Sequence, residues 1–129
     1  VLGLLPNKSK EQVCAEMRQA LLASGQFAES DFDLTFMYRH DSSVVDAGHP
    51  LPQGLLAAGA AVGVPLAIDA MTASCDAWFY TNQLGIPTVV YGPGTLAVAH
   101  SKDEHIAMPD IAEAATVLTR FALDFCNPR

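Results

Sequence analysis

The sequence predicts an α/β fold with a partly parallel sheet, and three patterns point to it. Helical and strand-like segments alternate after position 46. Residues 1–45 follow a strand, helix, strand order, and residues 86–91 form a continuous apolar run rich in β-branched side chains. Such a run is typical of a strand that is covered on both faces of its sheet. The 129 residues, half of them hydrophobic, suffice for one ordinary core.

The N-terminal part is expected to begin with a short apolar strand at residues 1–5. Ser9 then starts a predicted helix, because Gln12 three residues later completes a capping box. Gly25 is the expected stop of this helix. Residues 31–39 alternate apolar and polar side chains, which predicts a half-buried strand.

The texture of the sequence changes near residues 46–50, and we place a domain boundary there. One domain is expected over residues 1–45 and a second over residues 46–129. The second begins with an Ala- and Leu-rich segment at residues 51–62, whose spacing predicts a helix. Residues 64–71 follow as an apolar strand candidate.

The rest of the second domain is expected to continue the alternation. Residues 75–84 predict a short helix that Gly85 ends, and residues 86–91 predict a buried strand. Pro109 is well placed for the first turn of a final helix, whose apolar residues repeat every three or four positions up to Asn127. Two strands are few for a complete sheet, so the chain is expected to be the tail of a larger protein.

Composition excludes several classes of function. The net charge is −7 and no basic cluster occurs, so nucleic-acid binding is not expected. No uninterrupted apolar run is long enough to span a membrane, so membrane association is not expected either. Cys14, Cys75 and Cys126 are scattered with no CxxC pair, which argues against a disulfide framework and a thiolate zinc site. A reducing, cytoplasmic location follows as the simplest expectation.

The residues that carry chemistry follow the predicted strand at 86–91. Gly92, Pro93 and Gly94 form a loop at its carboxyl end, where ligands bind in open α/β sheets. His100 lies shortly after, and its imidazole is a candidate metal ligand whose second N–H needs an acceptor, such as a nearby carboxylate. By spacing alone the other interpretation, an exposed or hydrogen-bonded histidine, stays open. Glu104 is one carboxylate in reach along the chain.

Three stretches, residues 75–79, 84–94 and 99–104, resemble in sequence and order the C-terminal signature of a metallopeptidase family. That family includes acetylornithine deacetylase, succinyl-diaminopimelate desuccinylase, aminoacylase and glutamate carboxypeptidase. The resemblance covers roughly residues 72–125, and more loosely the part before. It implies that residues 1–45 end a ferredoxin-like lid or dimerisation domain. Residues 46–129 would then be the C-terminal part of a mixed-sheet catalytic domain.

What the resemblance implies for function is a hydrolase with two metal ions, usually zinc, with cobalt or manganese as possible substitutes. The substrate class is an N-acyl amino acid or small peptide, whose amide bond is cleaved with the help of the metals. The partners implied are the missing N-terminal part of the catalytic domain and, through the lid, a second copy in a homodimer. The matching residues are His100 as a metal ligand, Gly92, Pro93 and Gly94 at the substrate, and Asp76 and Glu104 as supporting residues around the ligands.

The sequence departs from the family pattern in several places. Trp78 stands where a basic residue is common, and Gly3 where the lid often has Arg. Nothing matches the family's remaining metal ligands or its general base, and one histidine cannot hold a catalytic zinc site, which typically needs about three protein ligands. No catalytic residue is therefore assigned to this chain, and we expect the chain alone to be inactive.

Two rival hypotheses stay open. One is a truncated or degenerate family member that acts as a non-catalytic binding or dimerisation module. The other is an α/β domain that binds a small molecule without metal. His40, His49 and His105 are expected to be capping or surface residues. Ser101 lacks the Gly-x-Ser-x-Gly pattern of a serine hydrolase.

Overall fold

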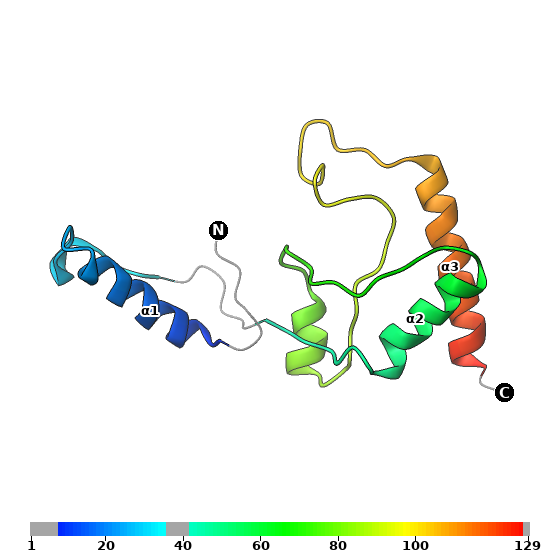
Figure 1. Ribbon diagram of the computed structural model, residues 1–129, viewed down its shortest axis with the longest axis horizontal. Helices are drawn as coiled ribbons and strands as arrows, with labels where there is room; N and C mark the ends of the chain where they lie inside the picture. Colours follow the sequence, from blue (N-terminus) through cyan, green and yellow to red (C-terminus); the bar gives the residue numbers. More distant parts are fainter. Residues whose placement is uncertain (1–7, 36–41, 128–129) are drawn as a thin grey trace.

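The computed structural model describes residues 8–35 and 42–127. Its elements are α1 (Lys10–Ala23), the 3-10 helix η1 (Glu29–Asp31), α2 (Pro50–Ala61), the π-helical turn η2 (Phe79–Gln83) and α3 (Met108–Cys126). Figure 1 shows α1 apart from the other helices, while α2 packs across α3 and long irregular segments link the remaining elements. The molecule is therefore built around one helix pair.

The prediction of an α/β fold is wrong, because the described residues contain helices and no β-strand. The expected ferredoxin-like lid and mixed-sheet catalytic domain are wrong for the same reason, because both contain a β-sheet. The runs 64–71 and 86–91 have no regular secondary structure, since a strand needs a neighbour to satisfy its backbone N–H and C=O groups. The predicted strand at 1–5 lies outside the described residues. So does part of the one at 31–39, whose described residues form no strand.

The predicted start and end of the first helix are confirmed. The Ser9 hydroxyl oxygen accepts the N–H of Gln12 at 3.2 Å, and the Gln12 side-chain oxygen accepts the N–H of Ser9 at 2.9 Å. These two bonds satisfy donors that a helix N-terminus otherwise leaves unpaired. After Ala23 the chain turns at Gly25, whose φ of 68° suits glycine and disfavours other residues.

Polar and aromatic contacts tie α1 to the segment that follows it. Arg18 forms an ion pair with Glu29, and its guanidinium group lies 5.5 Å from the centre of the Phe32 ring. Phe32 in turn meets Phe27 edge to face, with ring centres 6.4 Å apart. No residue of α1 is buried, so these local contacts rather than a core hold residues 8–35 together.

The second helix begins where the sequence predicts it. The Nδ1 atom of His49 accepts the N–H of Leu51 at 3.1 Å, and Pro50 occupies the first turn, where its missing N–H does no harm. The expectation of a capping role for His49 is therefore confirmed. The final helix is confirmed as well, with Pro109 in its first turn and Asn127 as its C-cap.

The core lies between α2 and α3, and two glycines make it possible. Leu55, Ala58 and Val117 are buried at the contact. An ideal Cβ atom at Gly54 would lie 3.0 Å from the Phe121 ring. One at Gly59 would lie 2.7 Å from both the Leu66 side chain and the Val64 carbonyl oxygen. The glycines thus let α3 and the returning chain approach α2 closely. The partly buried residues packed around this contact are Val62, Val64, Leu66, Val89, Tyr91 and Phe121.

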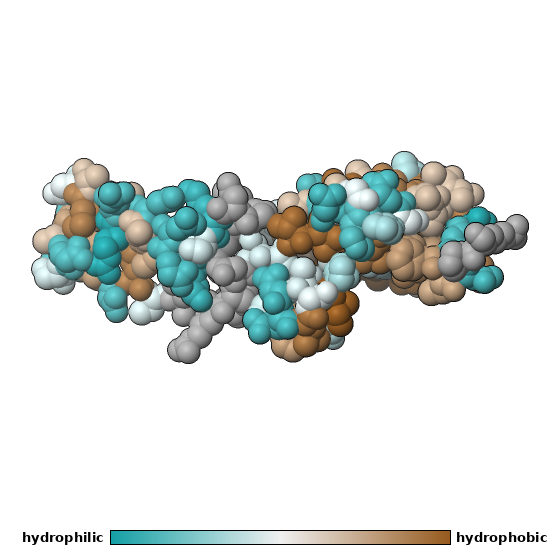
Figure 2. All heavy atoms as spheres, turned by 90° about the horizontal axis from the view of Figure 1, so that it is seen from below, coloured by the Kyte–Doolittle hydropathy of each residue, from teal (hydrophilic) through white to brown (hydrophobic). Residues whose placement is uncertain are grey.

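The chain exposes much more surface than a compact monomer. Its accessible area is 9798 Å², whereas a globular protein of its mass exposes about 6,600 Å². Met108, Leu123 and Val90 are 74%, 65% and 56% exposed. Figure 2 shows hydrophobic residues on the surface of the half that holds α2 and α3. None of the described helices has the length and apolar character required to cross a bilayer.

The tight approach at Gly59 predicts the effect of adding a methyl group there. Alanine favours a helix over glycine by up to about 1 kcal/mol. Overlap with the Val64 backbone oxygen, however, costs about 1–3 kcal/mol, because backbone cannot move aside as a side chain can. We therefore expect Gly59→Ala to lower the stability of the chain in urea unfolding followed by circular dichroism.

Gly54→Ala is the matched control, since its added Cβ meets the Phe121 ring, which can shift. It should be tolerated better than Gly59→Ala. Equal or greater stability of Gly59→Ala relative to wild type would show that α2 and the returning chain are not in close contact.

Candidate functional site

The run 86–91 connects η2 to the predicted substrate loop. Val89 and Tyr91 pack against the α2–α3 core, which fixes where the run ends and the loop begins. Gly92 follows immediately, and a Cβ atom there would meet nothing within 4 Å. The backbone at Gly92 is therefore open to an approaching molecule.

The segment after Gly92 leaves the helices and returns to its own start. Gly94 has a φ of 83°, and an added Cβ would lie 3.4 Å from the Ile106 side chain. The Ile106 side chain therefore lies close to the Gly94 backbone, and this approach closes residues 94–106, here called the His100 loop, at its base. Figure 1 shows the loop in yellow and orange, away from α2. Compact loops with close ends of this kind are frequently functional.

His100 lies within this loop and is exposed. Its φ is 59°, and among residues 8–35 and 42–127 no other residue except glycine has a left-handed backbone. No described residue forms a hydrogen bond with its imidazole. Ser101 beside it is well bonded: its N–H and its hydroxyl both donate to the Val98 carbonyl oxygen, at 3.3 and 2.8 Å. The hydroxyl oxygen also accepts the N–H of Asp103 at 3.2 Å.

The other predicted site residues have different surroundings. Glu104 is exposed, and its N–H donates to the Ser101 carbonyl oxygen at 3.2 Å. Asp76 is exposed at the start of the η2 turn, where its carbonyl oxygen accepts the N–H of Phe79 at 3.0 Å. Figure 1 shows η2 and the His100 loop at opposite ends of the run 86–91. The structure thus groups Gly94, His100 and Glu104 in one loop and leaves Asp76 apart from them.

The fit of these residues to a metal ion is incomplete. Within the described part of the chain, no group of three or more His, Cys, Asp or Glu side chains is placed to hold a metal. The His100 imidazole is exposed and chemically suited to be one ligand, but a catalytic zinc typically needs about three. By themselves the described residues therefore do not form a metal site.

The remaining histidines and cysteines have ordinary surroundings. His105 is exposed, as expected, and its Nδ1 atom lies 2.7 Å from the Asp103 carbonyl oxygen. His40 lies outside the described residues. Cys14, Cys75 and Cys126 are free thiols.

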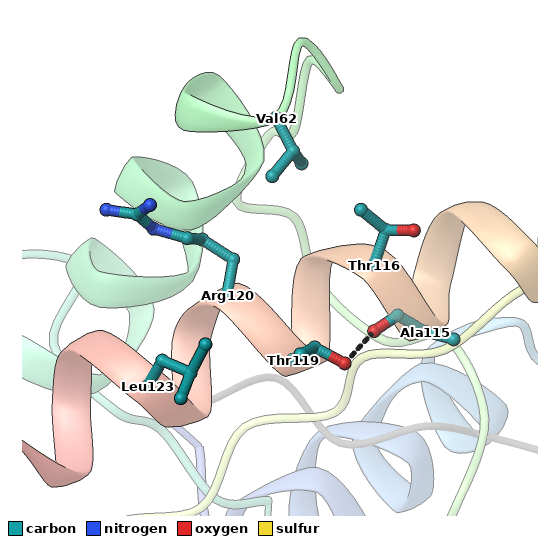
Figure 3. A pocket seen from close by; sticks show the side chains of 6 residues that line it. All are labelled: Val62, Ala115, Thr116, Thr119, Arg120 and Leu123. Atoms are coloured by element: carbon teal, nitrogen blue, oxygen red, sulfur yellow. Dashed lines mark hydrogen bonds between the residues drawn. The ribbon is translucent and has the colours of Figure 1, made fainter.

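Two surface hollows lie away from the His100 loop. The larger, of about 400 Å³, is shown in Figure 3, where side chains of α3 face Val62 at the end of α2. Its polar groups are already paired: Thr116 and Thr119 each donate to a carbonyl oxygen one turn earlier at 2.8 Å, and Arg120 contacts Asp124. The second hollow, of about 190 Å³, includes His49, which is occupied as a helix cap. Neither hollow presents a set of free reactive groups.

Two roles in the His100 loop are not evident from the sequence. Ile106 closes its base, and the Ser101 hydroxyl bridges residues on both sides of His100. A serine followed two residues later by Asp is a weak turn signal that could have indicated the second. The first depends on a contact across the loop that no local pattern encodes.

Comparison with known proteins decides the family. Residues 6–124 match the model of peptidase family M20/M25/M40. The chain belongs to this family. The resemblance recognised in the motifs between residues 75 and 104 is therefore confirmed.

Individual relatives of this M20/M25/M40 chain agree with the assignment. The N-formyl-4-amino-5-aminomethyl-2-methylpyrimidine deformylase of Bacillus subtilis (strain 168) is 27% identical over an aligned length of 140 residues. The alignment covers 95% of this chain and 32% of the relative. The acetylornithine deacetylase of Myxococcus xanthus is 38% identical over 37% of this chain and 13% of its own length. An uncharacterized metallohydrolase of Methanocaldococcus jannaschii is 37% identical over 33% of this chain and 12% of its own length.

The match to the deformylase takes in nearly all of this chain, but the chain spans only about a third of the length of the deformylase. No solved structure matches the chain. The family is thus established from sequence relatives alone.

Tyr91, which anchors the run leading to Gly92, predicts a dependence of stability on pH. Burial raises the pKa of its phenol, and the negative charge of Glu113 raises it further. A raised pKa means that the folded chain holds this proton more tightly than the unfolded chain does. Its contribution to stability is therefore complete below the ordinary tyrosine pKa of about 10 and is lost as the pH rises through the raised pKa.

We expect Tyr91→Phe to lose less stability than wild type between about pH 8 and about pH 10.5, because phenylalanine has no proton to lose. Urea unfolding at the two pH values measures the difference. An equal loss in both proteins would show that the phenol is not buried against the core.

Proposed function

We propose that this chain is part of a metal-dependent hydrolase that cleaves the amide bond of a small N-acylated amine, with His100 as one metal ligand. The observation that carries the proposal is the family match over residues 6–124, which contains the predicted motifs in the family's order. The exposed, unbonded imidazole of His100 supports it, because a ligand must be free to reach its metal.

The names of the relatives support the substrate class. One removes a formyl group from an aminomethylpyrimidine and another an acetyl group from ornithine, so both act on an acylated nitrogen. The resemblance in the motifs favours an N-acyl amino acid or small peptide. The relative that covers 95% of this chain favours an N-formyl amine on a ring. We therefore propose an N-acylated amine and include both kinds in the test.

The metal we propose is zinc, in a site with two ions. Neutral imidazole is a good zinc ligand, and one relative is named a metallohydrolase. Among the described residues His100 is the one ligand that we propose, and no group of three or more ligating side chains accompanies it, so in this proposal the remaining ligands and the general base come from outside the described residues. When bound, the metal would supply an activated water and polarise the scissile carbonyl group.

The contribution of the chain's own residues is to present a ligand and an open backbone. Gly92 leaves room for a substrate beside its peptide group, because no atom lies within 4 Å of an added Cβ. Pro93 restricts the backbone next to it. Gly94 and Ile106 hold the base of the His100 loop. The loop therefore begins next to the open backbone at Gly92, where we propose that the substrate lies.

The partner we propose is the remaining part of the catalytic domain. The chain exposes about 3,200 Å² more than a compact monomer of its mass, which exceeds the roughly 1,000–2,500 Å² per partner that obligate interfaces commonly bury. On α3 only part of the apolar face is covered: Ala114 and Val117 are buried, whereas Ile111, Leu118 and Phe125 are 39%, 44% and 44% exposed. Residues of this kind are depleted from free surfaces and enriched at permanent interfaces.

Two further parts of the proposal concern assembly and location. We propose a homodimer through residues 1–45, on the strength of the family resemblance. We also propose a cytoplasmic location, since the chain has three free thiols and a reducing compartment keeps thiols reduced.

The test uses the complete hydrolase, meaning this chain joined to the missing part of the catalytic domain. We expect this protein to bind zinc and to hydrolyse an N-acylated amine from a panel of N-formyl and N-acetyl amino acids and N-formyl aminomethylpyrimidines. His100→Ala should weaken zinc binding at least about tenfold and reduce turnover by about two orders of magnitude or more, because a ligand is lost. Chelator competition and amine release measure the two effects.

His105→Ala is the matched control, because it removes an exposed imidazole from the same loop. It should leave zinc affinity and turnover unchanged. The chain alone should release no amine. Unchanged metal binding in His100→Ala would refute the ligand assignment. A complete protein without metal or turnover would favour a non-catalytic binding or dimerisation module.

A further inference from the structure

The backbone at His100 is held in a conformation that its residue type disfavours. A φ of 59° places it in the left-handed region, where the Cβ atom of any residue except glycine is crowded by the next carbonyl group. Gly25, Gly63, Gly85 and Gly94 are the other described residues with positive φ. A histidine therefore needs surrounding contacts that hold its backbone in this left-handed conformation.

The hydrogen bonds of Ser101 provide such contacts. Its hydroxyl group donates to the carbonyl oxygen of Val98, two residues before His100, at 2.8 Å. The same oxygen accepts the N–H of Asp103, three residues after His100, at 3.2 Å. One side chain thus bridges the two arms of the turn that has His100 at its bend. The backbone of Ser101 adds bonds to Val98 and Glu104.

We propose that Ser101 is a positioning residue whose hydroxyl group keeps His100 left-handed and thereby fixes the direction in which the imidazole leaves the loop. The proposal rests on the proposed function, because a fixed direction matters only if the imidazole is a metal ligand. It gives the serine of this loop a role that involves no nucleophilic chemistry.

The strengths of the interactions are compatible with this role. Two hydrogen bonds are of the same order as the penalty for a left-handed residue other than glycine. Without the hydroxyl group, the turn loses both side-chain bonds, and His100 can relax to an ordinary backbone conformation. Its Cβ direction would then change, since side-chain direction follows the backbone. A ligand that must be reoriented before binding has a lower affinity for its metal.

Thr95 offers a matched comparison in the same loop. Its hydroxyl oxygen accepts the N–H of Ala97 at 3.2 Å, so it also stabilises a turn. No residue with a left-handed backbone lies between these two bonded groups. Removal of the Thr95 hydroxyl should affect the local turn without reorienting His100. The difference between the two variants isolates the positioning effect from a general loss of loop hydrogen bonds.

The experiment measures zinc affinity and thermal stability of the complete hydrolase in parallel. We expect Ser101→Ala to weaken zinc binding about 10–100-fold, the range typical of residues that orient a metal ligand. Ser101→Thr should restore affinity, because it keeps the hydroxyl group, and Ser101→Cys should be intermediate. Thr95→Ala should leave affinity unchanged. The melting temperatures of the alanine variants without metal should be similar.

Crystal structures of the wild type and of Ser101→Ala provide the direct readout, with a positive φ at residue 100 expected only in the first. Zinc affinity that Ser101→Ala leaves unchanged, or that Ser101→Thr does not restore, would overturn the proposal. His100→Ala separates this failure from that of the proposed function. If His100→Ala weakens zinc binding and Ser101→Ala does not, the positioning role is wrong and the ligand assignment stands. If neither does, the ligand assignment is wrong.

Discussion

The close contact of α2 with its neighbours through Gly54 and Gly59 is the constraint on which the rest of the structure depends. Because neither residue has a Cβ atom, Phe121 of α3 and the returning chain at Leu66 can reach the α2 backbone. The small core that results includes Val89 and Tyr91, so it also fixes the run that ends at Gly92. The position of the His100 loop is therefore set by glycines that lie some forty residues earlier in the sequence.

Local signals predicted the helices well. Ser9 and Gln12 form the expected capping box, and His49 caps α2. Both signals act within one turn of the chain, so the sequence contains all that they need. The runs 64–71 and 86–91 were predicted as strands from their composition, but a strand depends on a partner that local sequence cannot specify. In the described residues they meet the α2–α3 core with their side chains instead.

The candidate site shows the same division. The motif around His100 was sufficient to recognise the family, and the match over residues 6–124 confirms it. The left-handed backbone of His100, the bridge made by Ser101 and the closure at Ile106 depend on how the loop folds back, which the motif does not reveal. The incomplete ligand set and the large exposed area lead to one interpretation. We propose that the chain presents a preformed loop to a site that further residues complete.

The most direct test of this account is a crystal structure of the complete hydrolase with zinc, in which anomalous scattering locates the metal. The account predicts a ring nitrogen of His100 about 2.0–2.1 Å from a zinc ion, with the other ligands from outside this chain. It also predicts that α3 is covered at Ile111 and Leu118. A zinc ion bound only by other residues, with His100 pointing into solvent, would contradict it.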